Sequence, residues 1–196
     1  MAGQSNDCNP DRPAIWLCHQ INRNLSQAPA WMTADEGKAL ARLEGPRRQE
    51  YLTSRWLIRQ ALARASGEAP TCCHPVPGRP VASASPQGWH LSLSHSQGLA
   101  ACATGRAALG IDLEPSQRRP DWARVTTRWF TPVEQEWLLR ANNAFSFLKV
   151  WTLKEAWLKA TGRGIAGNLQ TLEVRKNFEL YGDQPDRHWQ TSCLYA

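Results

Sequence analysis

Short apolar runs and capped amphipathic segments alternate along the first part of the chain. Residues 14–18 form an apolar run that is typical of a strand. Residues 33–43 begin with a Thr-x-x-Glu pattern, which predicts a helix with a capped start. A second helix is expected over residues 46–65, because a proline suits its first turn and Gly67 can end it.

The predicted second helix has two different faces on a helical projection. The apolar face is formed by Tyr51, Leu57, Ile58, Ala61, Leu62 and Ala65. Three arginines, Arg48, Arg55 and Arg59, fall together on another face. We therefore expect a basic stripe along this helix.

The middle of the chain shows the pattern of loops and strands. Residues 70–86 are rich in proline, serine and glycine, which predicts an irregular loop. Alternating leucines and serines lead from residue 91 to an expected turn at residues 94–96. The apolar residues 99–103 and 109–113 are predicted to be two strands of a hairpin.

The last third of the chain repeats the order of strand, helices and strands. Residues 131–140 start with a second Thr-x-x-Glu cap, and a longer helix is expected over residues 144–160, followed by Gly162. Three further strands are predicted at residues 169–175, 178–181 and 189–195.

The order of these elements predicts an α+β protein. We expect two similar halves, residues 1–108 and 109–196, that pack together as a pseudo-dimer within one chain and hold an active site in the cleft between them.

Composition places the chain among soluble proteins. Of its 196 residues, 42% are hydrophobic and 20% are charged, and no apolar run approaches the roughly 18 residues that a membrane span needs. The first dozen residues lack the basic-then-apolar order of a secretory signal, so we expect a cytoplasmic protein. Six cysteines without a C-x-x-C pattern are expected to be reduced thiols.

The formal charge of +6 indicates an anionic partner. A nucleic acid, a phosphorylated small molecule and an acidic protein would each satisfy it, and charge alone does not choose among them.

Two carboxylates lie side by side in one predicted strand. Because side chains alternate along a strand, Asp112 and Glu114 share one face, while Ile111 and Leu113 point to the other. A solvated acidic face would explain this pattern. However, neighbouring like charges are unfavourable unless a cation neutralises them, and Mg²⁺ is the natural candidate.

A carboxylate and an ammonium stand four residues apart in the predicted helix 144–160. Glu155 and Lys159 therefore share a face, which an ordinary surface ion pair would also explain. Ser94 and His95 follow a strand and can bind phosphate oxygens. We see no aspartate or second base placed to form a nucleophilic triad with Ser94, which disfavours a serine hydrolase.

Taken in order, these segments resemble the phosphopantetheinyl transferase family, both the long single-chain branch typified by surfactin-synthetase activators and the compact bacterial holo-carrier-protein synthases. The matching segments are Gly78-Arg79-Pro80, residues 91–95, residues 110–114, and residues 151–159 with Gly162 and Gly164. Arg47 and Arg48, with Leu52, Arg55 and Arg59, resemble the basic helix of the family.

The resemblance implies particular roles for the residues at these positions. Asp112, Glu114 and Glu155 would hold Mg²⁺ against the pyrophosphate of coenzyme A. Lys159 would contact the same phosphates and act with Glu155 in catalysis. The remaining coenzyme A ligands would be Arg47, Arg48, Arg79, Ser94 and His95, of which the last three grip the adenosine and its ribose phosphate.

The activity that the resemblance implies is transfer of the 4′-phosphopantetheinyl group from coenzyme A to a serine of an acidic apo carrier protein, by a monomer that binds neither membrane nor nucleic acid. Three alternatives stay open at this point. They are a Mg²⁺-dependent nucleotide phosphohydrolase, a non-catalytic nucleic-acid-binding protein that uses the arginine stripe, and a degenerate family member retained as a scaffold.

Overall fold

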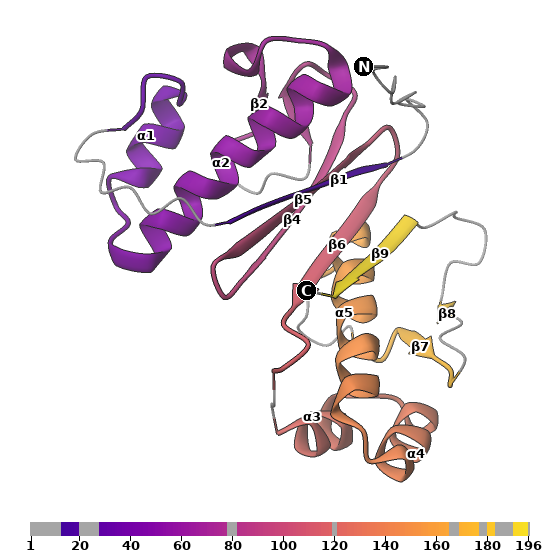
Figure 1. The fold of residues 1–196 in the computed structure, drawn as a ribbon. Helices are drawn as coiled ribbons and strands as arrows, with labels where there is room; N and C mark the ends of the chain where they lie inside the picture. The colour runs from indigo at the N-terminus through magenta and orange to yellow at the C-terminus, as the bar shows by residue number, and fades with distance from the viewer. Residues whose placement is uncertain are drawn as a thin grey trace, which may run out of the picture.

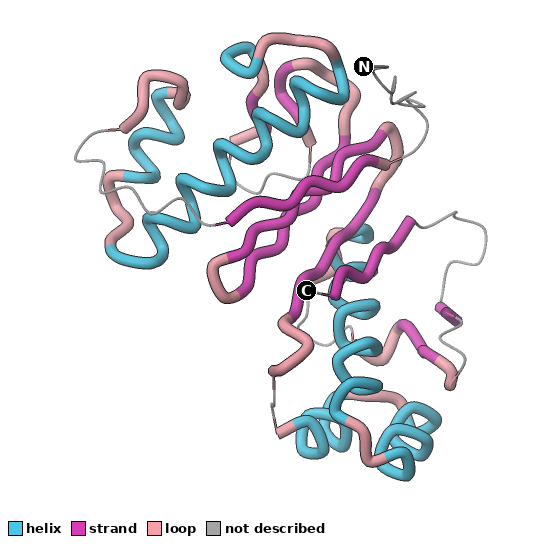
Figure 2. The backbone as a smooth tube through the Cα atoms, viewed as in Figure 1, coloured by secondary structure: helices cyan, strands magenta, loops and turns pink. Residues whose placement is uncertain are grey.

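Helices and strands are mixed along the chain (Figure 2), which confirms the α+β class. The computed structural model describes residues 13–19, 28–77, 82–118, 121–164 and 169–176, together with the backbone of residues 180–182 and 190–195. In this part of the chain, no helix has both the length and the apolar character that crossing a bilayer requires.

A three-stranded antiparallel sheet and one long helix organise the N-terminal part. Its elements are β1 (Ala14–His19), α1 (Ala34–Leu40), α2 (Gly45–Ser66), the short 3₁₀ helix η1 (Pro70–Cys72), β2 (His74–Pro75), β3 (Ser83–Ser85), β4 (His90–Ser96) and β5 (Leu99–Gly105). The sheet has the strand order β1-β5-β4, and α2 lies across it (Figure 1). The apolar face of α2 packs on this sheet, with Ile58, Ala61 and Leu62 in its core.

The C-terminal part is built around a second long helix. Its elements are β6 (Leu109–Glu114), α3 (Trp122–Trp129), α4 (Pro132–Ala141), α5 (Ala144–Thr161), β7 (Leu172–Val174), β8 (Leu180–Gly182) and β9 (Gln190–Tyr195). Strand β6 pairs in parallel with β9, and α5 runs alongside both (Figure 1). Gly110 allows this close approach, because a Cβ at that position would lie 1.8 Å from the Ala156 carbonyl oxygen.

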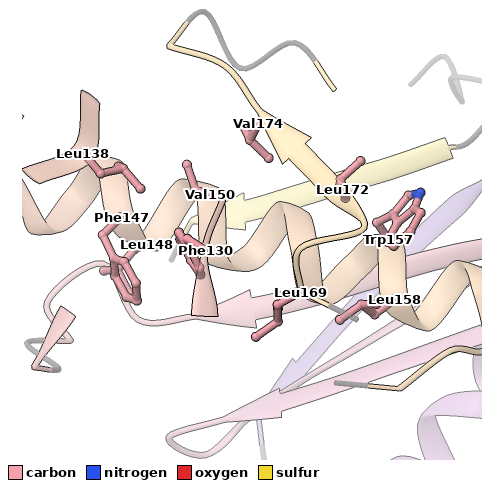
Figure 3. Packing of buried hydrophobic residues seen from close by; sticks show 10 residues of the cluster. All are labelled: Phe130, Leu138, Phe147, Leu148, Val150, Trp157, Leu158, Leu169, Leu172 and Val174. Atoms are coloured by element: carbon pink, nitrogen blue, oxygen red, sulfur yellow. The ribbon is translucent and has the colours of Figure 1, made fainter. Parts of the chain in front are cut away.

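Aromatic and aliphatic side chains from α4, α5 and β7 close the core of the C-terminal part. Figure 3 shows these buried side chains gathered along α5, and Phe130 and Phe147 stack with ring centroids 5.6 Å apart. Burial of such rings is the main stabilising term here. It fixes α5, the helix that carries Glu155 and Lys159.

Serine hydroxyls join β6 to β4 where a backbone ladder would be expected. The Ile111 N–H donates to Ser92 Oγ at 3.0 Å, and the Leu113 N–H donates to Ser94 Oγ at 3.1 Å. The side chains therefore satisfy backbone donors that would otherwise be buried and unpaired. We call this contact the serine seam.

The structure corrects two predicted connections. The expected hairpin of residues 99–103 and 109–113 is wrong, because β5 pairs with β4 and β1, whereas β6 pairs with β9. The turn predicted at residues 94–96 is also wrong. Strand β4 continues to Ser96, and the reversal falls at Gln97 and Gly98, which both have positive φ.

The structure differs from the sequence-based expectations in two further places. The loop predicted over residues 70–86 contains η1 and the paired strands β2 and β3, while Gly78-Arg79-Pro80 lies outside the described residues. Helix α3 was not predicted; it begins after Asp121, whose side chain accepts a hydrogen bond from the Arg124 N–H.

The predicted basic stripe on α2 is wrong as a surface feature. Arg55 and Arg59 are only 7% and 2% exposed, and both contact the buried Glu36 of α1. Arg48 donates to the Leu40 carbonyl oxygen at 2.7 Å. The arginines therefore hold α1 against α2, because buried guanidinium groups require acceptors and anions.

Candidate active site

The two acidic residues of β6 are buried. Asp112 is 6% exposed and Glu114 is 8% exposed, and strand alternation places both on one face as predicted. Asp112 Oδ1 accepts a hydrogen bond from Ser94 Oγ at 3.0 Å and forms an ion pair of 2.7 Å with Lys159 Nζ. Its other oxygen, Oδ2, is buried and lacks a hydrogen-bond partner in the described structure. One carboxylate oxygen is thus left for a further ligand.

Glu114 forms an ion pair with Arg118, four residues along the chain. Burial raises the pKa of Glu114, and the nearby charge of Asp112 raises it further. The charge of Arg118 and hydrogen bonds from Trp151 and Arg118 act in the opposite direction but do not cancel the rise. Glu114 is therefore a carboxylate that a cation would stabilise in its charged form.

Helix α5 supplies the third carboxylate. Its Asn143 cap and its Gly162 end fix the register, and the four-residue spacing puts Glu155 and Lys159 on one face. Burial, followed by the charge of Asp112, raises the pKa of Glu155 to about 7, while Lys159 opposes the rise. The effect of Asp112 shows that the carboxylates of α5 and β6 are electrostatically coupled.

A cavity of about 580 Å³ opens where α2, β4 and α5 meet. Its wall includes the basic and polar residues Arg47, Tyr51, Arg55, Ser92, His95 and Lys159, the acids Glu50 and Glu155, and the apolar Leu43, Leu91 and Leu158. A cavity of this size and mixed lining fits an extended, phosphate-bearing small molecule.

Two family models match consecutive parts of the chain. The 4′-phosphopantetheinyl transferase superfamily model matches residues 108–195, and the model of the 4′-phosphopantetheinyl transferase N-terminal domain matches residues 35–105. A protein of Synechocystis sp. that bears the name of a 4′-phosphopantetheinyl transferase is 30% identical over 92% of this chain and 79% of its own. This chain belongs to the 4′-phosphopantetheinyl transferase superfamily.

Two other relatives agree with this assignment. The 4′-phosphopantetheinyl transferase HetI of Nostoc sp. is 33% identical over 79% of this chain and 69% of its own. The 4′-phosphopantetheinyl transferase Sfp of Bacillus subtilis is 28% identical over 50% of this chain and 46% of its own. The protein is thus a transferase enzyme, and the comparisons give no support to the nucleotide phosphohydrolase or nucleic-acid-binding alternatives.

The structure of this phosphopantetheinyl transferase brings four of the predicted site residues to one cavity. Arg47, His95, Glu155 and Lys159 all line the cavity, although they come from three different elements. His95 Nδ1 lies 3.8 Å from Glu50 Oε1, which is too long for a hydrogen bond. Glu50 is a neighbour that the sequence pattern did not single out.

Two predicted coenzyme ligands are placed differently, and a third is not described. Ser94 is buried in the serine seam and gives its hydroxyl hydrogen to Asp112, so its visible role is to hold the carboxylate. Arg48 lies in a separate hollow beside α1 and away from the cavity. Arg79 lies outside the described residues, and its assignment stays a prediction.

Tyr51, Ser92 and Arg55 also line the cavity. Ser92 and Arg55 lie in segments that match the family, but sequence reasoning gave none of the three a role at the site. Tyr51 was assigned to the apolar face of α2. A signal was nevertheless present, since Arg47, Tyr51 and Arg55 follow one another at intervals of four residues, which is the spacing of a single helix face.

A buried ion pair between Lys154 and Glu134 lies next to Glu155 of the site. Lys154, next to Glu155 in the chain, is fully buried and lies 2.8 Å from Glu134 Oε1. Its Nζ also donates to the carbonyl oxygens of Leu169 and Leu172. Glu134 was predicted only as a helix cap, but it also accepts a hydrogen bond from the Val174 N–H. The ion pair and these hydrogen bonds therefore hold α4, α5 and β7 together.

Proposed function

We propose that this transferase moves the 4′-phosphopantetheinyl group of coenzyme A to a serine of an acidic apo carrier protein in a Mg²⁺-dependent reaction. The observation that carries the proposal is that Glu155 and Lys159 of α5 line one cavity with Arg47 and His95, while Asp112 of β6 forms an ion pair with Lys159. The charge of +6 supports recognition of two anionic substrates.

The chemistry of the donors, three carboxylates and one buried oxygen without a hydrogen-bond partner, fits a magnesium ion, although the carboxylates are not gathered around one point. In the described part of the chain, no three acidic, histidine or cysteine side chains are placed to hold a metal together. Lys159 and Arg118 instead neutralise the carboxylates of β6. Even so, Asp112 Oδ2 is a buried oxygen without a partner, and carboxylate oxygens are the ligands that Mg²⁺ prefers. Asp112, Glu114 and Glu155 would hold the ion.

The residues of this chain supply positioning and proton transfer. Lys159, held by Asp112 and the Ile111 carbonyl oxygen, keeps an ammonium at the cavity wall for the pyrophosphate. Glu155 can accept the proton of the carrier serine, because its raised pKa makes it a stronger base than an exposed glutamate. A Mg²⁺ ion, when bound, supplies positive charge that neutralises the reacting phosphates.

The overall reaction is a phosphoryl transfer. The serine oxygen forms a bond to the phosphorus that bears pantetheine, the bond from that phosphorus to the bridging oxygen breaks, and adenosine 3′,5′-bisphosphate leaves. Arg47, Arg79 and His95 are proposed to hold the adenosine side. The assignment of Arg48 has no support from the cavity, because its guanidinium is bonded beside α1.

We also propose that the chain acts as a monomer whose two halves, residues 1–108 and 109–196, flank the active site. The walls of the cavity support this, since α2 and β4 precede the boundary at residue 108 and α5 follows it.

Incubation with coenzyme A, Mg²⁺ and a panel of apo carrier proteins tests the proposal. We expect one carrier to gain the mass of the phosphopantetheinyl arm, and EDTA to abolish the gain. An arm without carrier separates this activity from a phosphohydrolase, which would consume the coenzyme by itself. Failure of every carrier, together with coenzyme hydrolysis, would contradict the proposal.

A further inference from the structure

The turn after β6 folds a guanidinium group back towards the proposed metal ligands. Strand β6 ends at Glu114, and Pro115 has no N–H with which to continue the pairing. The Arg118 N–H donates to the Pro115 carbonyl oxygen at 2.9 Å, which closes a tight turn. At the end of this turn the Arg118 side chain forms an ion pair with Glu114. The sequence after β6 therefore places a cation beside one of the three carboxylates.

Each carboxylate of β6 is paired with a cation of the chain itself. Lys159 Nζ lies 2.7 Å from Asp112 Oδ1, and Arg118 pairs with Glu114 Oε1. Two like charges on one face of a strand are unfavourable without such neutralisation. The two side chains supply the positive charge that the proposed Mg²⁺ would also supply, so the metal and the side chains compete for the same carboxylates.

The two cations are held differently. Lys159 Nζ also donates to the Ile111 carbonyl oxygen at 3.1 Å, and Lys159 lines the cavity. The side chain of Arg118 is 46% exposed, whereas that of its partner Glu114 is 10% exposed. A half-exposed ion pair of this kind contributes little stability, and its long side chain can turn outward into water. Arg118 is therefore the cation that a stronger competitor displaces more easily.

The charge of Arg118 acts on more than one carboxylate. Burial raises the pKa of Glu114 and of Glu155, and the charge of Arg118 acts against the rise in both. A cation that stabilises two ionised carboxylates in this way must also repel a second cation that they bind. Loss of the Arg118 charge would therefore favour a metal ion at these residues.

We infer that Arg118 is an internal counter-ion of Glu114 that competes with Mg²⁺ and so sets the metal affinity of the enzyme. This inference rests on the proposed function, in which Asp112, Glu114 and Glu155 hold the ion. When the ion binds, the guanidinium leaves Glu114 and turns into the solvent that already reaches it. The buried carboxylate is thereby never left without a positive charge beside it, which would be unfavourable.

A purely structural ion pair would change metal binding in the opposite direction. If Arg118 only closed the turn after β6, its removal would loosen Glu114 and weaken metal binding. If Arg118 competes with the metal, its removal strengthens metal binding. The direction of the change in Mg²⁺ affinity therefore separates the two roles.

The test is a calorimetric titration of Mg²⁺ into the EDTA-treated and dialysed protein at about pH 8, without coenzyme or carrier. We expect Arg118→Gln to bind Mg²⁺ about 3- to 10-fold more tightly than the wild type, the effect of removing one half-exposed charge. Arg118→Lys keeps the charge and should bind Mg²⁺ like the wild type. Arg124→Gln loses the same charge at an exposed position of α3 and is the matched control, with unchanged affinity.

Arginine-directed modification gives a second readout on the wild-type protein. Phenylglyoxal followed by peptide mass spectrometry should modify Arg118 faster when Mg²⁺ is present, and Arg124 at an unchanged rate. Weaker or equal Mg²⁺ binding by Arg118→Gln, or an Arg118 reactivity indifferent to Mg²⁺, would overturn the inference. Absence of Mg²⁺ binding in both the wild type and Arg118→Gln would contradict the metal part of the proposed function as well, so the two failures are distinguishable.

Discussion

Burial and charge repulsion coincide at Glu155 more strongly than at the other site residues with a described shift. Its pKa is raised to about 7 by burial and by the negative charges of Asp112 and Glu114, whereas Lys159 and Arg118 oppose the rise. The charged form of a carboxylate in this situation is unfavourable unless a cation neutralises it. Such shifted groups are frequent at functional sites. Binding of a cation or of a substrate proton would therefore lower the electrostatic free energy of the site.

Replacing Glu155 with glutamine should abolish transfer and preserve the fold. Glutamine keeps the size and the helix propensity of glutamate but removes the charge and the base, so the rate should fall by about 10²-fold or more. Carrier modification at saturating coenzyme A and Mg²⁺ measures the loss, and circular dichroism checks folding. Glu136→Gln, at an exposed position of α4, is the control. A folded Glu155→Gln protein with near-normal turnover would remove the central residue of the proposal.

The periodicity of the sequence identified those site residues that lie on the same helix or the same strand. Asp112 with Glu114 and Glu155 with Lys159 were predicted correctly as neighbours on one face, because strand and helix periodicity fix such pairs. The bond from Ser94 to Asp112 joins residues 18 positions apart, and no local pattern reports it. For the same reason the burial of Arg55 was not predicted, because it depends on the packing of α1 against α2.

At the scale of elements, the approach of β6 to α5 sets the geometry of the site. Asp112 and Glu114 lie on the strand, Glu155 and Lys159 lie on the helix, and Gly110 is the point where the two backbones touch. A displacement here would separate the carboxylates of β6 from that of α5.

Gly110→Ala should therefore lower both stability and activity. The added Cβ would lie 1.8 Å from the Ala156 carbonyl oxygen, and backbone atoms on both sides must move to admit it. We expect a loss of about 1–3 kcal/mol or more in the free energy of unfolding. Gly37→Ala is the control, because its Cβ would meet its nearest neighbour at 3.6 Å. Urea denaturation of both variants tests this, and equal stabilities would contradict the close contact.

The Glu36 ion pairs should make the packing of α1 on α2 sensitive to acid. The pKa of Glu36 is lowered in the folded protein, so its stabilising contribution is complete above the ordinary value of 4.5 and is lost as the pH falls through the folded pKa. We expect the stability difference between the wild type and Glu36→Gln to shrink below pH 4.5. Denaturation midpoints from pH 7 to 3 measure it, and a constant difference would argue against an ionised Glu36.

Elements with strong local signals were predicted best. The Thr131 cap and the Gly67 and Gly162 ends predicted α2, α4 and α5 to within one residue, and the Thr33 cap predicted the start of α1, which ends three residues earlier than expected. Helix α3 was not predicted because it is only eight residues long and Asp121 alone marks its start. Strand partners could not be predicted, since β6 meets β9 across some 76 residues of chain and pairing depends on contacts that alternation does not encode.

At the scale of the whole molecule, the formal charge of +6 should govern the encounter with a carrier that is acidic, as proposed above. Charges on two protein surfaces are screened beyond roughly 8 Å at physiological ionic strength. The KM for the carrier should therefore rise steadily with added salt. The KM for coenzyme A, whose phosphates are proposed to bind inside the cavity, should rise less. Initial rates at several salt concentrations measure both, and a carrier KM indifferent to salt would exclude electrostatic recognition.

The serine seam makes the contact between β4 and β6 depend on two side chains. A backbone ladder forms with almost any side chains, but the joint between β4 and β6 exists only while residues 92 and 94 carry hydroxyl groups. A substitution of either serine can therefore change how β4 packs against β6 without altering the backbone pairing within either sheet. The packing of β4, which carries His95, against β6, which carries Asp112 and Glu114, thus depends on two small side chains that mutation can readily change.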